Sequence, residues 1–152
     1  MFHQTKRSMM VLRCSSAFKS MHEAVGAAEK LGALMLLSPK AVRTGKELEA
    51  AFYLAREAFK AKENVASSVA KEAMLFLACE TNFSSAIRKV GAASQDDFVL
   101  VSEGKIPSAK LKKALKLIRC EQLSLTEWGK KKGNYFEGEI AVEKMALSRI
   151  RN

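Results

Sequence analysis

The stretch VASSVAKEAMLFLACETNFSSAIRKVG, residues 65–91, decides how this chain folds. Ser67 or Ser68 can cap a helix that runs to about Ala78, because a serine hydroxyl accepts a backbone N–H of the first helical turn. Apolar residues nearly encircle this helix, which predicts a buried central element. They are Val69, Ala73, Met74, Phe76 and Leu77.

Helices are also expected on both sides of this element. Asn82 can cap a short helix over Phe83–Val90, and Gly91 is expected to end that helix in the left-handed conformation. Upstream, residues 46–61 form an amphipathic helix, because apolar side chains recur at helical spacing. Its apolar stripe consists of Leu48, Phe52, Ala55 and Phe59.

The remaining pattern alternates strands with helices. The expected strands are 9–13, 33–38, 97–102 and 122–126, and the further helices are 21–31, 107–118 and 138–150. Because 33–38 is apolar at every position up to Ser38, we expect it to be a central strand. The pattern predicts an α/β (α+β) fold, a small, mostly antiparallel sheet of three or four strands packed with several helices, as a single domain over residues 1–152.

Composition limits the possible functions. The chain has 152 residues and a formal charge of +10, which favours a polyanionic partner. Cys14, Cys79 and Cys120 show no Cys-x-x-Cys spacing, so we expect neither a zinc site nor a disulfide framework, but buried thiols in a reducing cytosol. No apolar run is long enough to span a membrane, so we expect a cytoplasmic protein without membrane contact.

Few residues are suited to catalysis. The sequence holds two histidines, and its only aspartates are the adjacent Asp96 and Asp97. Thr44-Gly45-Lys46 lacks the other residues of a phosphate-binding loop, so we interpret it as a loop entering a helix. We expect no metal, no cofactor and no enzyme activity. A small enzyme acting through Cys79 or Glu72 is the least favoured alternative.

Positive charge gathers between Gly104 and Cys120, where no acidic residue occurs. Such a cluster can neutralise RNA phosphates and release their counterions, although a solvated surface is the simpler explanation for any one lysine. The cations are Lys105, Lys110, Lys112, Lys113, Lys116 and Arg119.

Residues 65–91 resemble the signature region of the KEOPS subunit family that binds the PRPK-type kinase. The similar features are the Val65–Ser68 entry into an apolar helix, the central Glu72, and Ala86-Ile87 followed by Gly91. LLSPKAVRTGKELEAAFYLAREAF (36–59) and GEIAVEKMALSRI (138–150) resemble flanking parts of the family. The turn Cys79–Phe83 departs from the family's usual pattern, and residues 105–133 look shorter and more basic than usual.

The resemblance implies a non-catalytic subunit of the complex that makes threonylcarbamoyladenosine on tRNA. The family member docks on the small lobe of the kinase-like ATPase subunit and helps recruit tRNA, with a pocket for its 3′ CCA end. Carried over from that pocket, the candidate tRNA-binding residues are Lys60, Lys62, Asn64, Ser67, Ser68, Asn82, Phe83 and Arg88, to which the basic cluster adds Lys110, Lys112, Lys113 and Lys116.

For the kinase contact, the candidates lie on the helix at 46–61 and on the C-terminal helix; they are Phe52, Tyr53, Arg56, Met145, Arg149 and Ile150. Capping remains the alternative for Ser68 and Asn82, and core packing remains the alternative for Phe52, Phe83, Met145 and Ile150. A free-standing basic RNA-binding module that never meets a kinase is the alternative function.

Overall fold

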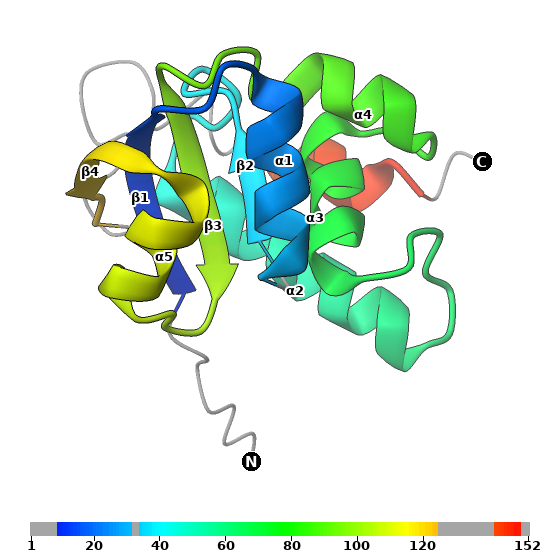
Figure 1. Cartoon of the computed structure of the whole chain (residues 1–152). Coiled ribbons are helices and arrows are strands. Elements are labelled where there is room, and N and C mark those ends of the chain that lie inside the picture. The colour runs from blue at the N-terminus through cyan, green and yellow to red at the C-terminus, as the bar shows by residue number, and fades with distance from the viewer. Residues whose placement is uncertain (1–8, 32–33, 125–141, 150–152) are drawn as a thin grey trace.

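Four strands form one antiparallel sheet at the centre of the molecule (Figure 1). They are β1 (Met9–Ser16), β2 (Leu34–Leu37), β3 (Phe98–Glu103) and β4 (Leu117–Gln122), in the spatial order β2-β3-β1-β4. A computed structural model of the chain describes residues 9–31, 34–124 and 142–149. The expected α+β fold with a small antiparallel sheet is therefore confirmed.

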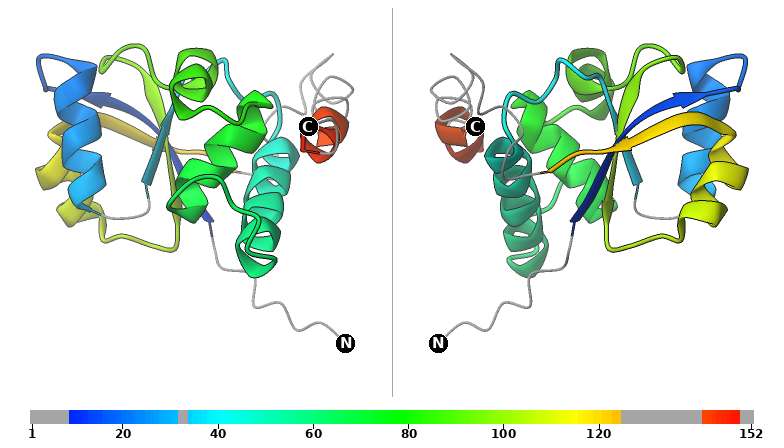
Figure 2. Two further views of the ribbon diagram at one scale, coloured as in Figure 1. Left: turned by 90° about the vertical axis from the view of Figure 1, so that its right-hand side faces the viewer. Right: turned by 90° about the vertical axis from the view of Figure 1, so that its left-hand side faces the viewer.

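Helices cover both faces of the sheet, as the two side views in Figure 2 show. One face packs against α1 (Met21–Lys30) and α5 (Ser108–Leu115). The other packs against α2 (Gly45–Lys60) and α3 (Val69–Ala78), with a short helix at 142–147 beside them. The helix α4 (Phe83–Val90) packs on α3.

The alternation of side chains along each strand divides the core into two parts. Val11 and Val101 belong to the part that packs against α2 and α3, whereas Leu12 and Leu100 belong to the part that packs against α1 and α5. Because successive strand residues point to opposite faces, a strand covered on both faces is apolar throughout. All five leading residues of β3, Phe98 to Ser102, are buried for this reason.

The starts of the helices agree with the capping signals in the sequence. The hydroxyls of Ser20, Thr44 and Ser68 accept the backbone N–H three residues later, at 3.3, 3.2 and 3.2 Å. Asn82 Oδ1 accepts the Ser85 N–H at 3.1 Å in the same way. Short polar side chains satisfy N–H groups that have no partner within the helix, which explains why the starts at Ser68 and Asn82 could be predicted locally.

The prediction that residues 33–38 form a central strand is wrong. β2 lies at the edge of the described sheet, next to β3. It is apolar because both of its faces are covered, and part of its outer edge is covered too. The Ser38 N–H donates to the Val90 carbonyl at 2.9 Å, and the Ala92 N–H donates to the Leu36 carbonyl at 3.2 Å. Burial on both faces thus removed the polar alternation that often marks an edge strand.

Gly91 was also assigned the wrong role. Its φ of −67° and ψ of 153° are extended rather than left-handed. A glycine is needed there because an added Cβ would lie 2.6 Å from the Ile87 carbonyl oxygen. At the end of the preceding helix, α3, the C-cap Cys79 is left-handed, with a φ of 53°.

The helix expected at 107–118 is shorter in the structure. α5 stops at Leu115, because Lys116 is left-handed with a φ of 49°, and β4 follows at once. Ile118, the last residue of the expected helix, lies in β4 and is 72% exposed. The strand expected at 122–126 is therefore earlier, at Leu117–Gln122.

Candidate nucleic-acid interface

Glu72 holds the connection between α2 and α3 in place. This fully buried carboxylate accepts the Val65 N–H at 3.0 Å and the Ala66 N–H at 2.8 Å. Its other oxygen accepts from Arg149 Nη1 at 3.1 Å, and the Arg149 guanidinium lies 4.3 Å from the centre of the Phe76 ring. A buried carboxylate needs such partners, because burial of an unpaired charge is costly. Glu72 therefore links the helix, the connection before it and the C-terminal segment.

The outer surface of this connection is open to solvent. Lys62, Asn64 and Ser67 are exposed, and Lys62 has a left-handed backbone with a φ of 58°. Asn64 Nδ2 donates to the Ala66 carbonyl at 3.0 Å, so part of its hydrogen-bonding capacity is used within the connection. Lys60, at the end of α2, pairs with Glu57 at 3.4 Å on the exposed surface. Lys62 and Ser67 make no side-chain hydrogen bond or ion pair with the residues that the structure describes.

A contact between a lysine and an aromatic ring joins α3 to the start of α4. The Lys71 ammonium is 5.6 Å from the centre of the Phe83 ring, which is half-buried against the core. Ser68 and Asn82 both act as caps, as their alternative interpretation expected. Further along α4, Arg88 is exposed and its Nη2 donates to Ser85 Oγ at 3.1 Å. A cation and an aromatic ring thus lie together at the start of α4, a combination that suits a phosphate and a base.

The basic cluster lies on α5 and its flanks. Five lysines are exposed, and none of them pairs with a carboxylate among the described residues; they are Lys105, Lys110, Lys112, Lys113 and Lys116. The Lys116 ammonium lies 4.9 Å from the centre of the Phe18 ring. Lys112 and Lys113 are in the last turn, where the helix dipole also favours a cation.

The two groups of candidate RNA-binding residues lie on opposite sides of the sheet (Figure 2). Lys62, Phe83 and Arg88 belong to the side of α2, α3 and α4, whereas α5 covers the other face. A single-stranded end that enters one of these surfaces does not reach the other. The sequence analysis put both groups into one candidate site, because residue type and charge do not show which face of the sheet a residue lies on.

The candidates for a kinase contact divide between core and surface. Phe52 and Met145 are 0% and 1% exposed, so they pack in the core and present no surface in this fold. Tyr53 is 48% exposed, and Arg56 pairs with Glu103 at 3.0 Å. Arg149 is engaged by Glu72, as described above, and Ile150 lies outside the described residues. The sequence analysis missed Leu147, on the short C-terminal helix, which is 45% exposed.

The groups considered for catalysis are not arranged for it. Glu72 is enclosed and its oxygens are occupied by the hydrogen bonds above. Cys79 is exposed, contrary to the expected burial, because the left-handed C-cap carries it past the end of α3. Desolvation nevertheless raises the pKa of its thiol, which disfavours the nucleophilic thiolate. No group of three or more potential metal ligands occurs within residues 9–31, 34–124 and 142–149.

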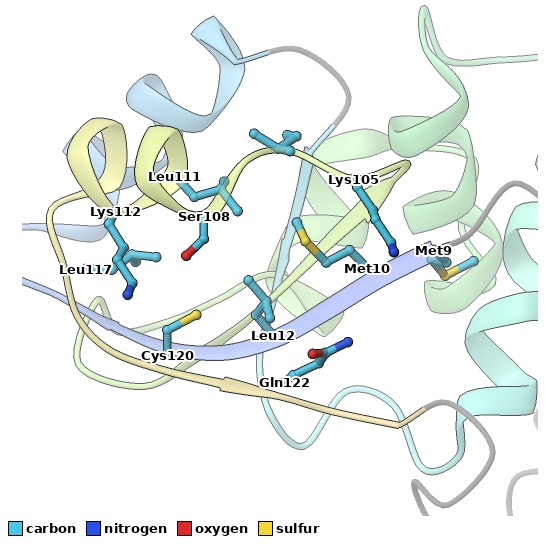
Figure 3. A pocket seen from close by; sticks show the side chains of 11 residues that line it. Met9, Met10, Leu12, Lys105, Ser108, Leu111, Lys112, Leu117, Cys120 and Gln122 are labelled. Carbon is cyan, nitrogen blue, oxygen red and sulfur yellow. The ribbon is translucent and has the colours of Figure 1, made fainter.

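A cavity of about 340 Å³ opens between the sheet and α5 (Figure 3). Its lining is largely apolar, with Met10, Leu12 and Leu111 as examples, and Lys105 and Lys112 add charge. Cys120 also lines it, and this sulfur lies 3.7 Å from the Cys14 sulfur. This pair could not be predicted from spacing, because the two cysteines are 106 positions apart.

No protein-family model matches this chain, and no curated protein matches it. In the part of the chain that the structure describes, none of the helices has the length and apolar character needed to cross a membrane.

Proposed function

We propose that this protein is a non-catalytic accessory subunit of the KEOPS complex, which binds the PRPK-type kinase subunit and recruits tRNA through its 3′ CCA end in the cytoplasm. The observation that carries the proposal is the resemblance of residues 65–91, in which the entry segment, the apolar helix, the central glutamate and the final glycine occur in the family's order. The net charge of +10 supports a polyanionic partner.

The contacts of Glu72 support treating this segment as one unit. The family's central glutamate falls on a residue that binds the backbone of the entry segment at Val65 and Ala66. Substitution of either part changes the shape of the other. Lys62 in the α2–α3 connection and Arg88 on α4 are exposed cations on the same side of the sheet, and Phe83 at the start of α4 is a half-buried aromatic ring. On this proposal these three residues receive the tRNA end, with cations for phosphates and the ring for a base.

The kinase contact is assigned to Tyr53 on α2 and to Leu147 on the C-terminal helix. Both are apolar or aromatic side chains that are about half exposed, at 48% and 45%. Partner helices and strands bind such exposed apolar groups, and buried members of the same helices cannot serve. Tyr53→Ala should weaken co-purification with the kinase subunit. Glu49→Ala, an exposed substitution on the same helix, should leave it unchanged.

A second candidate function is a free-standing basic RNA-binding module. It is favoured by the lysines of α5, which have no carboxylate partner within the described part of the chain. The two functions differ in their partner, so co-purification with the PRPK-type kinase subunit separates them. Stable retention of the kinase supports the first function, and failure to retain it while RNA still binds supports the second.

The RNA contribution is tested by fluorescence anisotropy with intact tRNA and with tRNA that lacks its CCA end, over a series of salt concentrations. A general footprint loses affinity for both RNAs in parallel as salt rises. A pocket for the end makes the truncated tRNA weaker by more than its missing phosphates explain. Equal affinities at every salt concentration would contradict recruitment through the CCA end.

A further inference from the structure

Cys14 and Cys120 face each other across the pairing of β1 with β4. They are directly opposite in the register of these antiparallel strands, and their sulfur atoms are 3.7 Å apart. Opposite residues in an antiparallel pair have Cα atoms about 4.5 to 5.5 Å apart, which lies within the range that a disulfide spans. A disulfide therefore needs side-chain adjustment but no displacement of the strands.

The two thiols differ in their access to solvent. Cys14 is 1% exposed, whereas Cys120 is an exposed residue of β4 and lines the cavity beneath α5. Figure 3 shows the Cys120 side chain pointing from β4 toward the space between the sheet and α5. Burial and the nearby Cys120 raise the pKa of the Cys14 thiol far above its usual value. Cys120 is thus the sulfur that a small oxidant reaches first.

We propose that Cys120 is an oxidation site, at which a hydroperoxide starts the formation of a Cys14–Cys120 disulfide. The Cys120 thiolate attacks an oxygen of the hydroperoxide, so that an S–O bond forms, the O–O bond breaks and an alcohol leaves after taking a proton from solvent. The Cys14 sulfur then attacks the Cys120 sulfenic acid. The S–S bond forms, the S–O bond breaks, and the hydroxyl leaves as water with the Cys14 proton.

The two steps balance as two thiols and one hydroperoxide giving one disulfide, one alcohol and one water. The two sulfurs lose the electron pair that the O–O bond gains. The product ties β4, the strand at one edge of the described sheet, to its neighbour β1. Because the link closes a long loop in the unfolded chain, it stabilises the folded state. The proposal rests on the strand geometry and is independent of any RNA or kinase contact.

The test treats the full chain with hydrogen peroxide, blocks the remaining thiols with an alkylating reagent and maps the peptides by mass spectrometry. We expect a linked peptide pair that contains Cys14 and Cys120, with Cys79 still alkylated. A reductant should restore all three thiols. Thermal unfolding of the oxidised chain should occur about 10 °C higher than that of the reduced chain.

Cys79 supplies the matched control. It is also exposed, but it is the C-cap residue of α3 and does not belong to the β1–β4 pair. Cys79→Ser should keep the linked peptides and the thermal shift, whereas Cys120→Ser should lose both. Peptide mapping of the unsubstituted chain is decisive even if a variant folds poorly. Oxidation of Cys120 to sulfinic acid while Cys14 stays alkylatable after unfolding overturns the proposal. Links found only between chains overturn it as well.

Discussion

The two faces of the sheet carry similar polar residues that are used in different ways. On the side of α2, α3 and α4, Ser68 and Asn82 cap helices and Lys60 forms an ion pair. On the side of α5, Lys112 and Lys113 have no carboxylate partner among the described residues. The first face uses most of these polar groups for contacts within the fold, whereas the second leaves its lysines without carboxylate partners in the described residues. Each face has a lysine ammonium near an aromatic ring, Lys71 near Phe83 and Lys116 near Phe18. Shape and contacts, rather than residue type, distinguish a recognition surface from an electrostatic one.

The largest expected effect concerns the carboxylate that organises the first face. Glu72→Ala removes the acceptor of the Val65 and Ala66 N–H groups and leaves Arg149 without its partner. Loss of one member of such a buried pair costs about 3 to 5 kcal/mol in the free energy of unfolding. Urea denaturation measures this loss. Glu49→Ala, exposed on α2, is the control and should change stability by less than about 0.5 kcal/mol.

An equal, small effect of the two glutamate substitutions would remove the distinction drawn between Glu72 and an ordinary surface carboxylate. The α2–α3 connection would then keep its shape without this anchor.

The next effect concerns the charge on the second face. Lys112→Ala with Lys113→Ala should make the dependence of tRNA affinity on salt less steep, by about 2 in the slope of log K against log salt, if each lysine neutralises one phosphate. Anisotropy at several salt concentrations measures the slope. Lys40→Ala, an exposed lysine away from α5, serves as the control. An unchanged slope in the double variant would show that the α5 lysines are merely solvated.

Capping and ligand contact can be separated at two neighbouring serines. Ser68→Ala removes the acceptor of the Lys71 N–H and should cost about 1 kcal/mol in stability. Ser67→Ala removes an exposed hydroxyl and should leave stability unchanged. Thermal or urea unfolding checks both values. A similar loss at Ser67 would show that its hydroxyl has a structural role, and would weaken its use as a free RNA contact.

The smallest effect is a pH dependence at the exposed pair of Arg13 and Asp97. The Arg13 guanidinium donates two hydrogen bonds, at 2.9 and 2.8 Å, and lowers the pKa of the Asp97 carboxyl below its usual value. Since the folded pKa is the lower one, the contribution is present above the unfolded pKa of about 3.9 and is lost as the pH falls through the folded pKa. At neutral pH Asp97→Asn should therefore have a lower free energy of unfolding than the unsubstituted chain, and this difference should disappear in acid.

Glu47 supplies a contrast of opposite sign. Burial raises the pKa of its carboxyl, so the cost of keeping it ionised is present at neutral pH and declines as the pH falls. At pH 7 Glu47→Gln should therefore have a higher free energy of unfolding than the unsubstituted chain, and this difference should disappear in acid. Unfolding measured over this pH range checks it. Curves of the same sign for Asp97→Asn and Glu47→Gln would contradict one of the two assignments, and the sign would show which one.

Local signals in the sequence predicted the helix starts at Ser68 and Asn82. The strand order could not be predicted, because it depends on contacts between distant parts of the chain. The caps at Ser68 and Asn82 depend on a few adjacent residues, so they could be placed from the sequence. The edge position of β2 depends on which strands pair with it, and that information lies in distant parts of the chain. The early end of α5 follows from a left-handed lysine, which no residue type announces, since lysine usually avoids this conformation.

The candidate site shows the same division. Charge and residue type selected Lys62, Arg88 and the α5 lysines, but only the fold separates them onto two faces. Phe52 and Met145 were chosen as surface residues from an apolar pattern that the core also requires. The pairing of Cys14 with Cys120 depends on strand register across most of the chain, so sequence spacing alone gave no indication of it.

The central claim is that the face of α2, α3 and α4 recognises the tRNA end, whereas α5 contributes only charge. The most direct measurement compares the affinity for tRNA with and without its CCA end in two matched variants, each of which removes two positive charges. One is Lys62→Ala with Arg88→Ala, and the other is Lys110→Ala with Lys113→Ala. We predict that the first variant loses the discrimination between the two RNAs, while the second binds both more weakly and keeps it. Equal loss of discrimination in both variants, or its persistence in the first, would contradict the account.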